Sequence, residues 1–382
     1  MSDPTPREQM GINPDFTYLN HASIGPLPRS SSKIIRNGFK LQMEEGERKI
    51  DYPGIEELWE LLTTNGAKLV GGDKEGITIT PNTAAGLHIV AEGLTSRYSQ
   101  QSNIVIPDVE FVTNSYTWQQ LTKKYHMELR FVNSVDGRID FNQWENRIDE
   151  NTVFISLSHI QSGNGFTTDL KQLVNLAHSR GALVVVDAIQ GLGAVPFDAK
   201  KYDVDFVAAA AYKWMLGPLG KGLFYVKPEL VEKLDTVLVG WFSTPNFREL
   251  YHQPFVPWPD ARIFQQSMID PTLNGFNESM QTLLNWGVAD TYSHIIRLHD
   301  YLIELLVGID GFSIGTSLEP NERSGILIIN HVQAELIVRY LETLKITVSF
   351  RAGGIRISPH RYNTKEDIDA LIDGIKSWIG KS

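Results

Sequence analysis

Two ionisable residues, Asp187 and Lys213, follow apolar runs that are typical of buried strands. The first run, residues 182–186, is rich in β-branched residues and has no polar alternation, which predicts a strand covered on both faces of a parallel sheet. The second run, residues 206–211, stops just before Lys213. Ligands of open α/β sheets bind at the carboxyl ends of such strands. The two residues therefore form either a partly buried ion pair or two contacts to one ligand.

One cofactor requires such a pair. Pyridoxal phosphate takes a lysine as a Schiff base, and a carboxylate against its pyridine nitrogen keeps that nitrogen protonated, so that the ring accepts electrons. Gln190, three residues after Asp187, could reach the ring hydroxyl. The sequence thus predicts that Lys213 and Asp187 are catalytic residues and that pyridoxal 5'-phosphate is the cofactor.

The motifs DAIQ at 187–190 and AAYKWMLGP at 210–218 resemble those of the class V aminotransferases, a group of pyridoxal-phosphate enzymes of fold type I. That group also includes cysteine desulfurases, kynureninases and isopenicillin N epimerases, and the resemblance covers nearly the whole chain. It implies an α/β fold with a large domain, whose mostly parallel seven-stranded sheet is flanked by helices, and a smaller α/β C-terminal domain. The implied divisions are 1–15, an N-terminal segment that joins the small domain, 16–258, the large cofactor-binding domain, and 259–382, the small domain.

Length and charge agree with a two-domain globular enzyme. The chain has 382 residues, and single hydrophobic cores stop growing at roughly 250 to 300 residues. A formal net charge of −10 argues against nucleic acid or a membrane surface as partner. The first ten residues lack the features of a signal peptide, and no apolar stretch approaches a membrane helix in length. We therefore expect a cytoplasmic protein.

The chain contains no cysteine, so it can form no disulfide, thiolate nucleophile or zinc–thiolate site. Cysteine desulfurases pass sulfur to an active-site cysteine, and the resemblance therefore favours the aminotransferase, epimerase and kynureninase branches. The ten histidines show no pair spaced to share one helix face as metal ligands. We expect no metal.

A phosphate site is predicted near residue 83. A short strand is expected at 77–80, and the following PNTAAG predicts a helix that starts at Thr83 with small residues in its first turn. Small residues let an anion approach the free N–H groups, where the helix dipole also favours negative charge. The resemblance implies that Thr83 donates its hydroxyl and Ala84 its N–H to the cofactor phosphate. A plain helix cap is the alternative.

Two aromatic residues depart from the cysteine desulfurase pattern and resemble kynureninases. Phe111 stands where desulfurases have a histidine stacked on the pyridine ring, and a phenylalanine there can also stack. Tyr212 replaces a histidine before the lysine and could bind phosphate or substrate. Ser162 replaces an asparagine, which leaves Gln190 as the main candidate for the ring hydroxyl. For Phe111 the alternative is an ordinary core residue.

The sequence SFRAGGIRISPHRYN contains the candidates for substrate binding. Arginine grips a carboxylate through two parallel N–H bonds, and the resemblance assigns this role to Arg356, with Arg351 as second choice. A surface ion pair is the alternative. His21, in a segment that crosses the active-site mouth in the family, is a further candidate, although an ordinary loop histidine fits equally well.

Residues 240–263 are rich in proline and aromatics and have no periodicity, which is typical of a functional loop. In the family this region reaches the neighbouring subunit, so the resemblance implies a homodimer. The usual Gly-Thr phosphate donor stands here as Ser267-Met268, and Trp241 and Arg262 are weaker site candidates.

Apolar periodicity predicts the remaining elements, and no internal repeat or G-x-G-x-x-G nucleotide motif is present. Strands are expected at 103–107, 129–132, 152–157, 222–226, 325–330, 346–351 and 354–358, and helices at 30–46, 54–70, 169–180, 276–307, 332–344 and from an N-cap at Thr364 through Trp378.

The predicted activity is that of a pyridoxal-phosphate-dependent aminotransferase acting on the α-amino group of a small amino acid, with a keto acid as second substrate. In this reaction Lys213 moves the α-proton as general base. A lyase or epimerase of the kynureninase or isopenicillin N epimerase kind is the alternative, because these reactions share the proton transfer. A binding protein of the same fold without turnover is a third hypothesis, against which the joint presence of Lys213, Asp187 and Gln190 argues.

Overall fold

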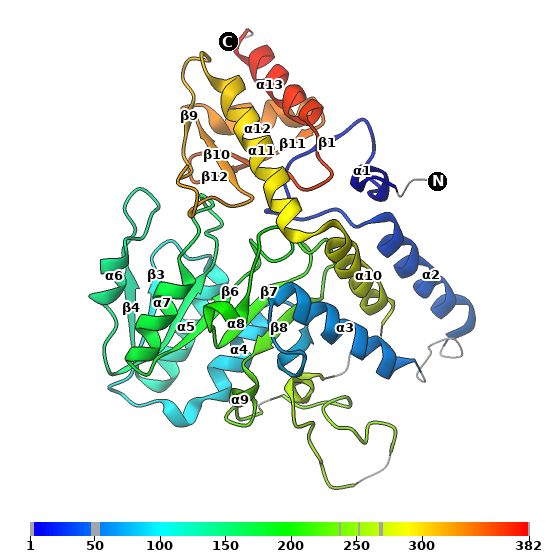
Figure 1. Ribbon diagram of the computed structural model, residues 1–382, viewed down its shortest axis with the longest axis vertical. Helices are drawn as coiled ribbons and strands as arrows, with labels where there is room; N and C mark the ends of the chain where they lie inside the picture. Colours follow the sequence, from blue (N-terminus) through cyan, green and yellow to red (C-terminus); the bar gives the residue numbers. More distant parts are fainter. Residues whose placement is uncertain (1–3, 47–53, 237, 251–252, 267–269, 381–382) are drawn as a thin grey trace.

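The computed structural model describes residues 4–46, 54–236, 238–250, 253–266 and 270–380 (Figure 1). A large α/β part is built on a seven-stranded sheet, and a smaller part on a four-stranded sheet lies at the other end of the molecule, together with the C-terminus. None of the helices in these ranges combines the length and the apolar character needed to cross a membrane.

The large sheet has the strand order β2-β8-β7-β6-β5-β3-β4. All neighbouring strands run parallel except β8, which is antiparallel to both β2 and β7. The prediction of a mostly parallel seven-stranded sheet is therefore confirmed. The strands are β2 (Ile77–Thr80), β3 (Asn103–Pro107), β4 (Glu128–Val132), β5 (Thr152–Ser158), β6 (Leu183–Asp187), β7 (Phe206–Ala210) and β8 (Gly222–Val226).

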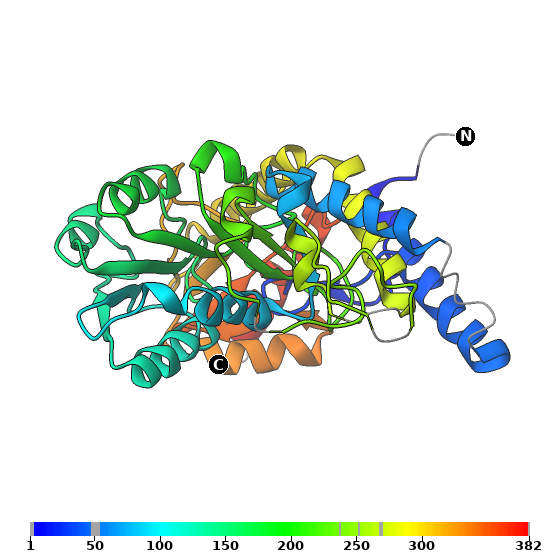
Figure 2. The same cartoon turned by 90° about the horizontal axis from the view of Figure 1, so that it is seen from below.

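Helices cover both faces of this sheet (Figure 2). Val184 and Val186 of β6 belong to one apolar cluster and Val185 to another, so successive side chains of the strand pack into two separate layers. This double burial explains the unbroken apolar run that predicted β6. The flanking helices are α3 (Ile55–Val70), α4 (Thr83–Gly93), α5 (Val112–Tyr125), α6 (Phe141–Glu145), α7 (Leu170–Ser179), α8 (Ala199–Tyr202) and α9 (Pro228–Val231), with short 3₁₀ turns η2 (Lys74–Gly76), η3 (Thr95–Arg97) and η4 (Ala261–Phe264).

The smaller part contains an antiparallel sheet of order β12-β13-β10-β9. Its last helix begins with a capping box between Thr364 and Asp367, as the sequence predicted. The single helix expected at 276–307 is instead two helices, because Gly287 adopts a φ of 74° and ends the first of them. The elements are α10 (Pro271–Trp286), α11 (Val288–Leu306), β9 (Ser313–Ile314), β10 (Leu327–Asn330), α12 (Ala334–Thr343), β12 (Ser349–Arg351), β13 (Gly354–Ile357) and α13 (Lys365–Ile379).

The N-terminal segment joins the two parts. After α1 (Pro6–Gln9), β1 (Thr17–Tyr18) pairs in parallel with β11 (Ile346–Thr347), and α2 (Arg29–Glu45) then packs against α10. Leu19 belongs to the core of the smaller part, whereas Leu273 of α10 belongs to the core beneath the large sheet. The domain limits at 15 and 258 remain a prediction.

Candidate active site

Lys213 lies in a tight turn after β7, and 7% of the residue is exposed. The turn is closed by hydrogen bonds from Ala211 N to Lys221 O at 2.8 Å and from Gly217 N to Ala211 O at 2.9 Å. Leu216 adopts a left-handed φ of 52°, which is unfavourable for a leucine and is found where surrounding contacts impose it. The protein thus fixes the backbone that carries the lysine.

Asp187 is the last residue of β6 and is 2% exposed. Its Oδ1 accepts a hydrogen bond from Ile189 N at 2.9 Å. Burial raises the pKa of Asp187 to about 7, and the nearby Glu110 charge adds to the rise, while the Ile189 N–H and the Lys213 charge oppose it. This carboxylate is therefore held in surroundings that favour a positively charged partner.

The two residues do not form the ion pair that the sequence left open as an alternative. Within the described ranges, no carboxylate oxygen lies within 4.0 Å of Lys213 Nζ. Burial lowers the pKa of Lys213 to about 8; the Asp187 charge opposes this shift, and the charges of Arg356 and Arg351 favour it. The lysine amine therefore loses its proton more easily than an exposed lysine would.

Two aromatic rings lie near the lysine amine. Nζ of Lys213 lies 5.6 Å from the centre of the Phe111 ring and 5.9 Å from that of Tyr212. Phe111 is the N-cap residue of α5 and is 46% exposed, so it is not the ordinary core phenylalanine that was the alternative. Its ring borders the space in front of the lysine, where it is available to a flat ligand.

The N-terminus of α4 meets the end of the lysine strand. Thr83 is its first helical residue, and Thr83 Oγ1 accepts a hydrogen bond from Ala210 N at 3.0 Å, which leaves its hydroxyl hydrogen free to donate. The helix cap is Asn82, whose side chain accepts from Ala85 N at 2.9 Å. The Ala84 N–H, in the first turn, has no acceptor within the helix. Both groups named for the phosphate are thus placed beside β7.

A glycine permits this close approach. A Cβ atom on Gly86 would lie 2.8 Å from the Ala208 Cβ of β7, so a larger residue would push α4 away from the sheet. Together, a helix N-terminus, a buried carboxylate, an aromatic ring and an amine with a lowered pKa fit the phosphate, pyridine nitrogen, ring face and aldehyde of the predicted cofactor.

Gln190 is buried and already bonded at both ends of its amide. Its Nε2 donates to Ala22 O at 3.1 Å, and its Oε1 accepts from Trp214 Nε1 at 3.0 Å. These bonds hold the N-terminal segment against the lysine turn. One amide hydrogen remains for the ring hydroxyl, so that role stays a prediction.

Arg356 on β13 is 2% exposed and carries three hydrogen bonds to neutral groups. Nε donates to Ser349 Oγ at 3.1 Å, Nη1 to Ser162 O at 2.9 Å, and Nη2 to Ser23 Oγ at 2.7 Å. Burial lowers the pKa of Arg356 to about 10, and the neighbouring Arg351 charge contributes to this shift. Neither arginine has a carboxylate partner in the described part of the chain, so the surface ion pair proposed as the alternative is absent there.

His21 requires a correction, because the structure places its ring in the core and not at the site mouth. It is 0% exposed, with Nδ1 bonded to Ser358 O at 3.0 Å and Nε2 to Tyr362 Oη at 2.9 Å. Burial holds the pKa of His21 well below its usual value. With both nitrogens engaged, the side chain joins the N-terminal segment to the smaller part and is not available to a substrate.

Glu110 is a site residue that the sequence analysis did not single out. Its oxygens accept hydrogen bonds from Ser158 N and Ser158 Oγ, both at 2.7 Å, from Gln161 Nε2 at 2.8 Å and from Asn114 Nδ2 at 2.9 Å. It thereby ties the loop after β5 to α5. An acidic residue just after a buried strand, the signal that identified Asp187, could have identified Glu110 as well.

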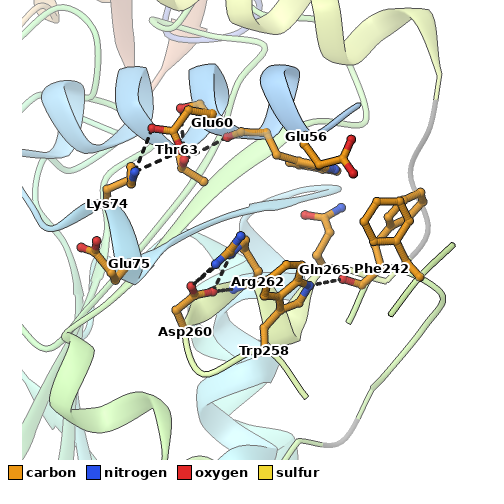
Figure 3. Close-up of a pocket in the computed structure, with 12 residues that line it drawn as sticks. Glu56, Glu60, Thr63, Lys74, Glu75, Phe242, Trp258, Asp260, Arg262 and Gln265 are labelled. Atoms are coloured by element: carbon orange, nitrogen blue, oxygen red, sulfur yellow. Dashed lines mark hydrogen bonds and ion pairs between the residues drawn. The ribbon is translucent and has the colours of Figure 1, made fainter. Parts of the chain in front are cut away.

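A cavity of about 180 Å³ lies between α3 and residues 242–247 and 258–265 (Figure 3). Arg262 lies there, 3.7 Å from the Trp258 ring centre and paired with Asp260, so the structure does not bring it to Lys213. Trp241 donates to Phe247 O in the same region. The predicted donor pair Ser267-Met268 lies outside the described residues.

In the described part of the chain, no group of three or more acidic or histidine side chains is arranged to hold a metal ion.

Comparison with known proteins gives consistent matches over most of the chain. A family profile described as aminotransferase class-V matches residues 56–371. An uncharacterized aminotransferase of Bacillus subtilis is 26% identical, covering 94% of this chain and 93% of its own. The isopenicillin N epimerase of Streptomyces clavuligerus is 25% identical, covering 98% of each.

Solved structures show the same fold. The apo cysteine desulfurase of Thermococcus onnurineus superimposes with a TM-score of 0.88 over 100% of both chains, at 19% identity. A mutant of the enzyme C-DES with glycine covalently linked to its PLP cofactor gives a TM-score of 0.87, covering 97% of this chain and 98% of the other, at 22% identity.

Proposed function

Because the chain belongs to the class V aminotransferase family, whose cofactor is pyridoxal phosphate, we propose that it is an aminotransferase that acts on the α-amino group of a small amino acid. The observation that carries this proposal is the environment of the Lys213 amine. Its amine is buried, has no carboxylate in contact among the described residues, and has a pKa lowered to about 8. An amine of this kind can both attach the cofactor and exchange protons near neutral pH.

When bound, pyridoxal phosphate supplies an electron-accepting ring that stabilises negative charge at the substrate α-carbon. Asp187 would contact the pyridine nitrogen, Phe111 the ring face, and Thr83 with Ala84 the phosphate. The protein holds the Asp187 carboxylate and the Lys213 amine in a site that is largely shielded from water. Charge stabilisation by fixed groups is strongest in such a site.

Lys213 would act as the general base that takes the proton from the substrate α-carbon. Its backbone is fixed by the turn after β7, and Tyr212 and Phe111 restrict the volume open to its side chain. A general base works best when its pKa lies near the working pH. The shift from 10.5 to about 8 brings the amine closer to that range.

Arg356 would bind the substrate carboxylate and so orient the α-carbon. Its guanidinium is already held by Ser349, Ser162 and Ser23, which reduces the ordering cost of binding. A substrate carboxylate could replace one of these hydrogen bonds and form the two parallel N–H bonds that arginine favours.

Sulfur transfer is not proposed, even though the family includes cysteine desulfurases. The chain has no cysteine to accept sulfur. The second candidate is an epimerase or lyase reaction, which the similarity to an isopenicillin N epimerase supports. Amino transfer and these reactions begin with the same removal of the α-proton. A homodimer and a cytoplasmic location are further expectations from the family and the composition.

The test is a single half-reaction. The purified holoenzyme is mixed with one amino acid in the absence of keto acid, and its visible absorption is followed. An aminotransferase loses the visible band as the cofactor takes the amino group, and an added 2-oxo acid restores the band. A band that persists while a cleaved or stereochemically inverted product forms would instead support the lyase or epimerase.

A further inference from the structure

Arg351 and Arg356 lie on one face of the small sheet. Strands β12 and β13 pair antiparallel, with Ser349 opposite Arg356 and Arg351 opposite Gly354. The Arg356 Nε bond to Ser349 Oγ shows that these two side chains share a face. Because side chains alternate along a strand, Arg351, two residues after Ser349, points to that same face. The arginines are thus diagonal neighbours, roughly 7–8 Å apart at the backbone.

The turn between the strands fixes this arrangement. Ala352 and Gly353 both have positive φ values, 48° and 78°, and they form a two-residue hairpin loop. Such loops set the register of the two strands that they connect. The loop after β5 contacts this hairpin, since Ser162 O accepts from Arg356 Nη1 and a Cβ on Gly163 would lie 3.9 Å from Ala352 Cβ.

Neither guanidinium is paired with an acidic side chain in the part of the chain that the structure describes. Arg356 donates only to neutral oxygens, and the exposed Arg351 donates from Nη1 to Phe350 O at 2.8 Å. Within the described ranges, no carboxylate lies within 4.0 Å of either group. Eight other described arginines have such a partner, namely Arg7, Arg130, Arg138, Arg180, Arg248, Arg262, Arg323 and Arg339, and six do not, so the proximity of this pair to Lys213, and not the missing partner alone, distinguishes it.

Both positive charges act on the catalytic lysine, because each contributes to the lowered pKa of Lys213. Glu110, the other acid near the site, is occupied by four hydrogen bonds, and burial raises its pKa. Since Asp187 is assigned to the pyridine nitrogen under the proposed function, the two guanidinium charges are left for the substrate.

We propose that the two arginines bind the two carboxylates of a dicarboxylic substrate, an amino acid with a side-chain carboxylate or the matching 2-oxo acid. Arg356, buried and held by three bonds, takes the carboxylate next to the reacting carbon. Arg351, exposed and held by one bond to its own backbone, takes the distal carboxylate. This inference rests on the proposed aminotransferase function and specifies its substrate class.

The first experiment measures selectivity with matched substrates. Initial rates of the half-reaction are compared for glutamate against glutamine and for aspartate against asparagine. We expect kcat/KM to favour the charged member of at least one pair by about 10- to 100-fold, the worth of a charge-assisted contact. Equal use of charged and neutral members of both pairs would overturn the inference.

The variant Arg351→Met separates this role from general damage. It should lower kcat/KM for the charged member by about 10-fold more than for the neutral member, and so remove the preference. Arg356→Met should lower kcat/KM for both members. The exposed Arg339, which pairs with Glu335 on α12, supplies the control variant Arg339→Met, which should behave as the unmodified enzyme. An equal loss for charged and neutral substrates in Arg351→Met would contradict a distal-carboxylate role.

A binding measurement separates this inference from the proposed reaction. Succinate and butyrate are titrated into the holoenzyme by calorimetry, since neither has an amino group to transfer. Succinate should bind at least about 10-fold more tightly than butyrate, and Arg351→Met should abolish the difference. That result would uphold the dicarboxylate site even if no amino transfer were found, whereas equal affinities would refute it even in an active aminotransferase.

Discussion

Asp187 and Lys213 affect each other's pKa across the site without forming an ion pair. They lie at the ends of the adjacent parallel strands β6 and β7, where Asp187 pairs with Ala208 and the lysine follows a few residues beyond. Each side chain is buried, and the two come from separate strands. This separation is what two contacts to opposite parts of one cofactor require, and it underlies the predictions that follow.

The variant Asp187→Asn tests the contact to the pyridine nitrogen. Asparagine keeps the oxygen that accepts from Ile189 N but removes the negative charge. We expect kcat to fall on the order of 100-fold, as when one charge-stabilising group is lost from an active site. Cofactor absorption should remain, because the Lys213 and Thr83 contacts persist. An unchanged kcat in steady-state assays would show that Asp187 does not tune the ring.

The same variant should change the pH dependence of stability of the cofactor-free protein. The pKa of Asp187 in the folded protein, about 7, lies above the ordinary aspartate value of 3.8. Between these pH values the folded state binds more protons than the unfolded state, so the wild type loses stability as pH rises through this window. Asp187→Asn should therefore gain free energy of unfolding relative to wild type from pH 4 to 7 and keep that gain above pH 7. Urea denaturation at several pH values measures this difference, and a pH-independent difference would be the contrary result.

Glu110→Gln tests the residue that ties the loop after β5 to α5. The amide would put an NH₂ group where the carboxylate accepts from Ser158, Gln161 or Asn114. We expect a loss of about 1–3 kcal/mol in the free energy of unfolding, the usual effect of unsatisfied buried polar groups. Chemical denaturation of the apoprotein measures this loss, and an unchanged midpoint would argue against the network.

Gly25→Ala tests how the N-terminal segment supports the lysine turn. Gly25 N donates to Tyr212 O at 2.7 Å, and an added Cβ would lie 2.1 Å from Lys213 O. Since backbone cannot yield as a flexible side chain can, we expect a loss of about 1–3 kcal/mol in stability together with reduced kcat. Gly11→Ala is the matched control, because its Cβ would meet only Arg29 Cγ at 3.6 Å. Equal behaviour of the two variants would exclude this support.

Much of the fold was predictable because its elements follow local patterns. The central strands are buried on both faces, so their sequences are unbroken apolar runs. Asp187 and Lys213 stand where such runs end. Phe111 and Thr83 likewise follow strands β3 and β2, so the topology of a parallel sheet brings them to the same edge. All four residues follow the ends of strands of this one sheet, and their contacts with the cofactor stay a prediction.

Other features depend on contacts that one sequence does not reveal. His21 was misplaced because its partners, Tyr362 and Ser358, are 341 and 337 residues away along the chain. The bonds of Arg356 to Ser23 and Ser162 join three distant segments in the same way. The break at Gly287 was available in the sequence, since glycine is the usual residue at a helix end with positive φ.

Attachment of the cofactor to Lys213 is the central claim, and it can be measured directly. The holoenzyme is reduced with borohydride, which makes the lysine–cofactor bond permanent, and is then digested and analysed by mass spectrometry. We predict a phosphopyridoxyl group on the peptide that contains Lys213, and none in Lys213→Ala treated in parallel. Modification of a different lysine, or a wild-type protein that takes up no cofactor, would contradict the account.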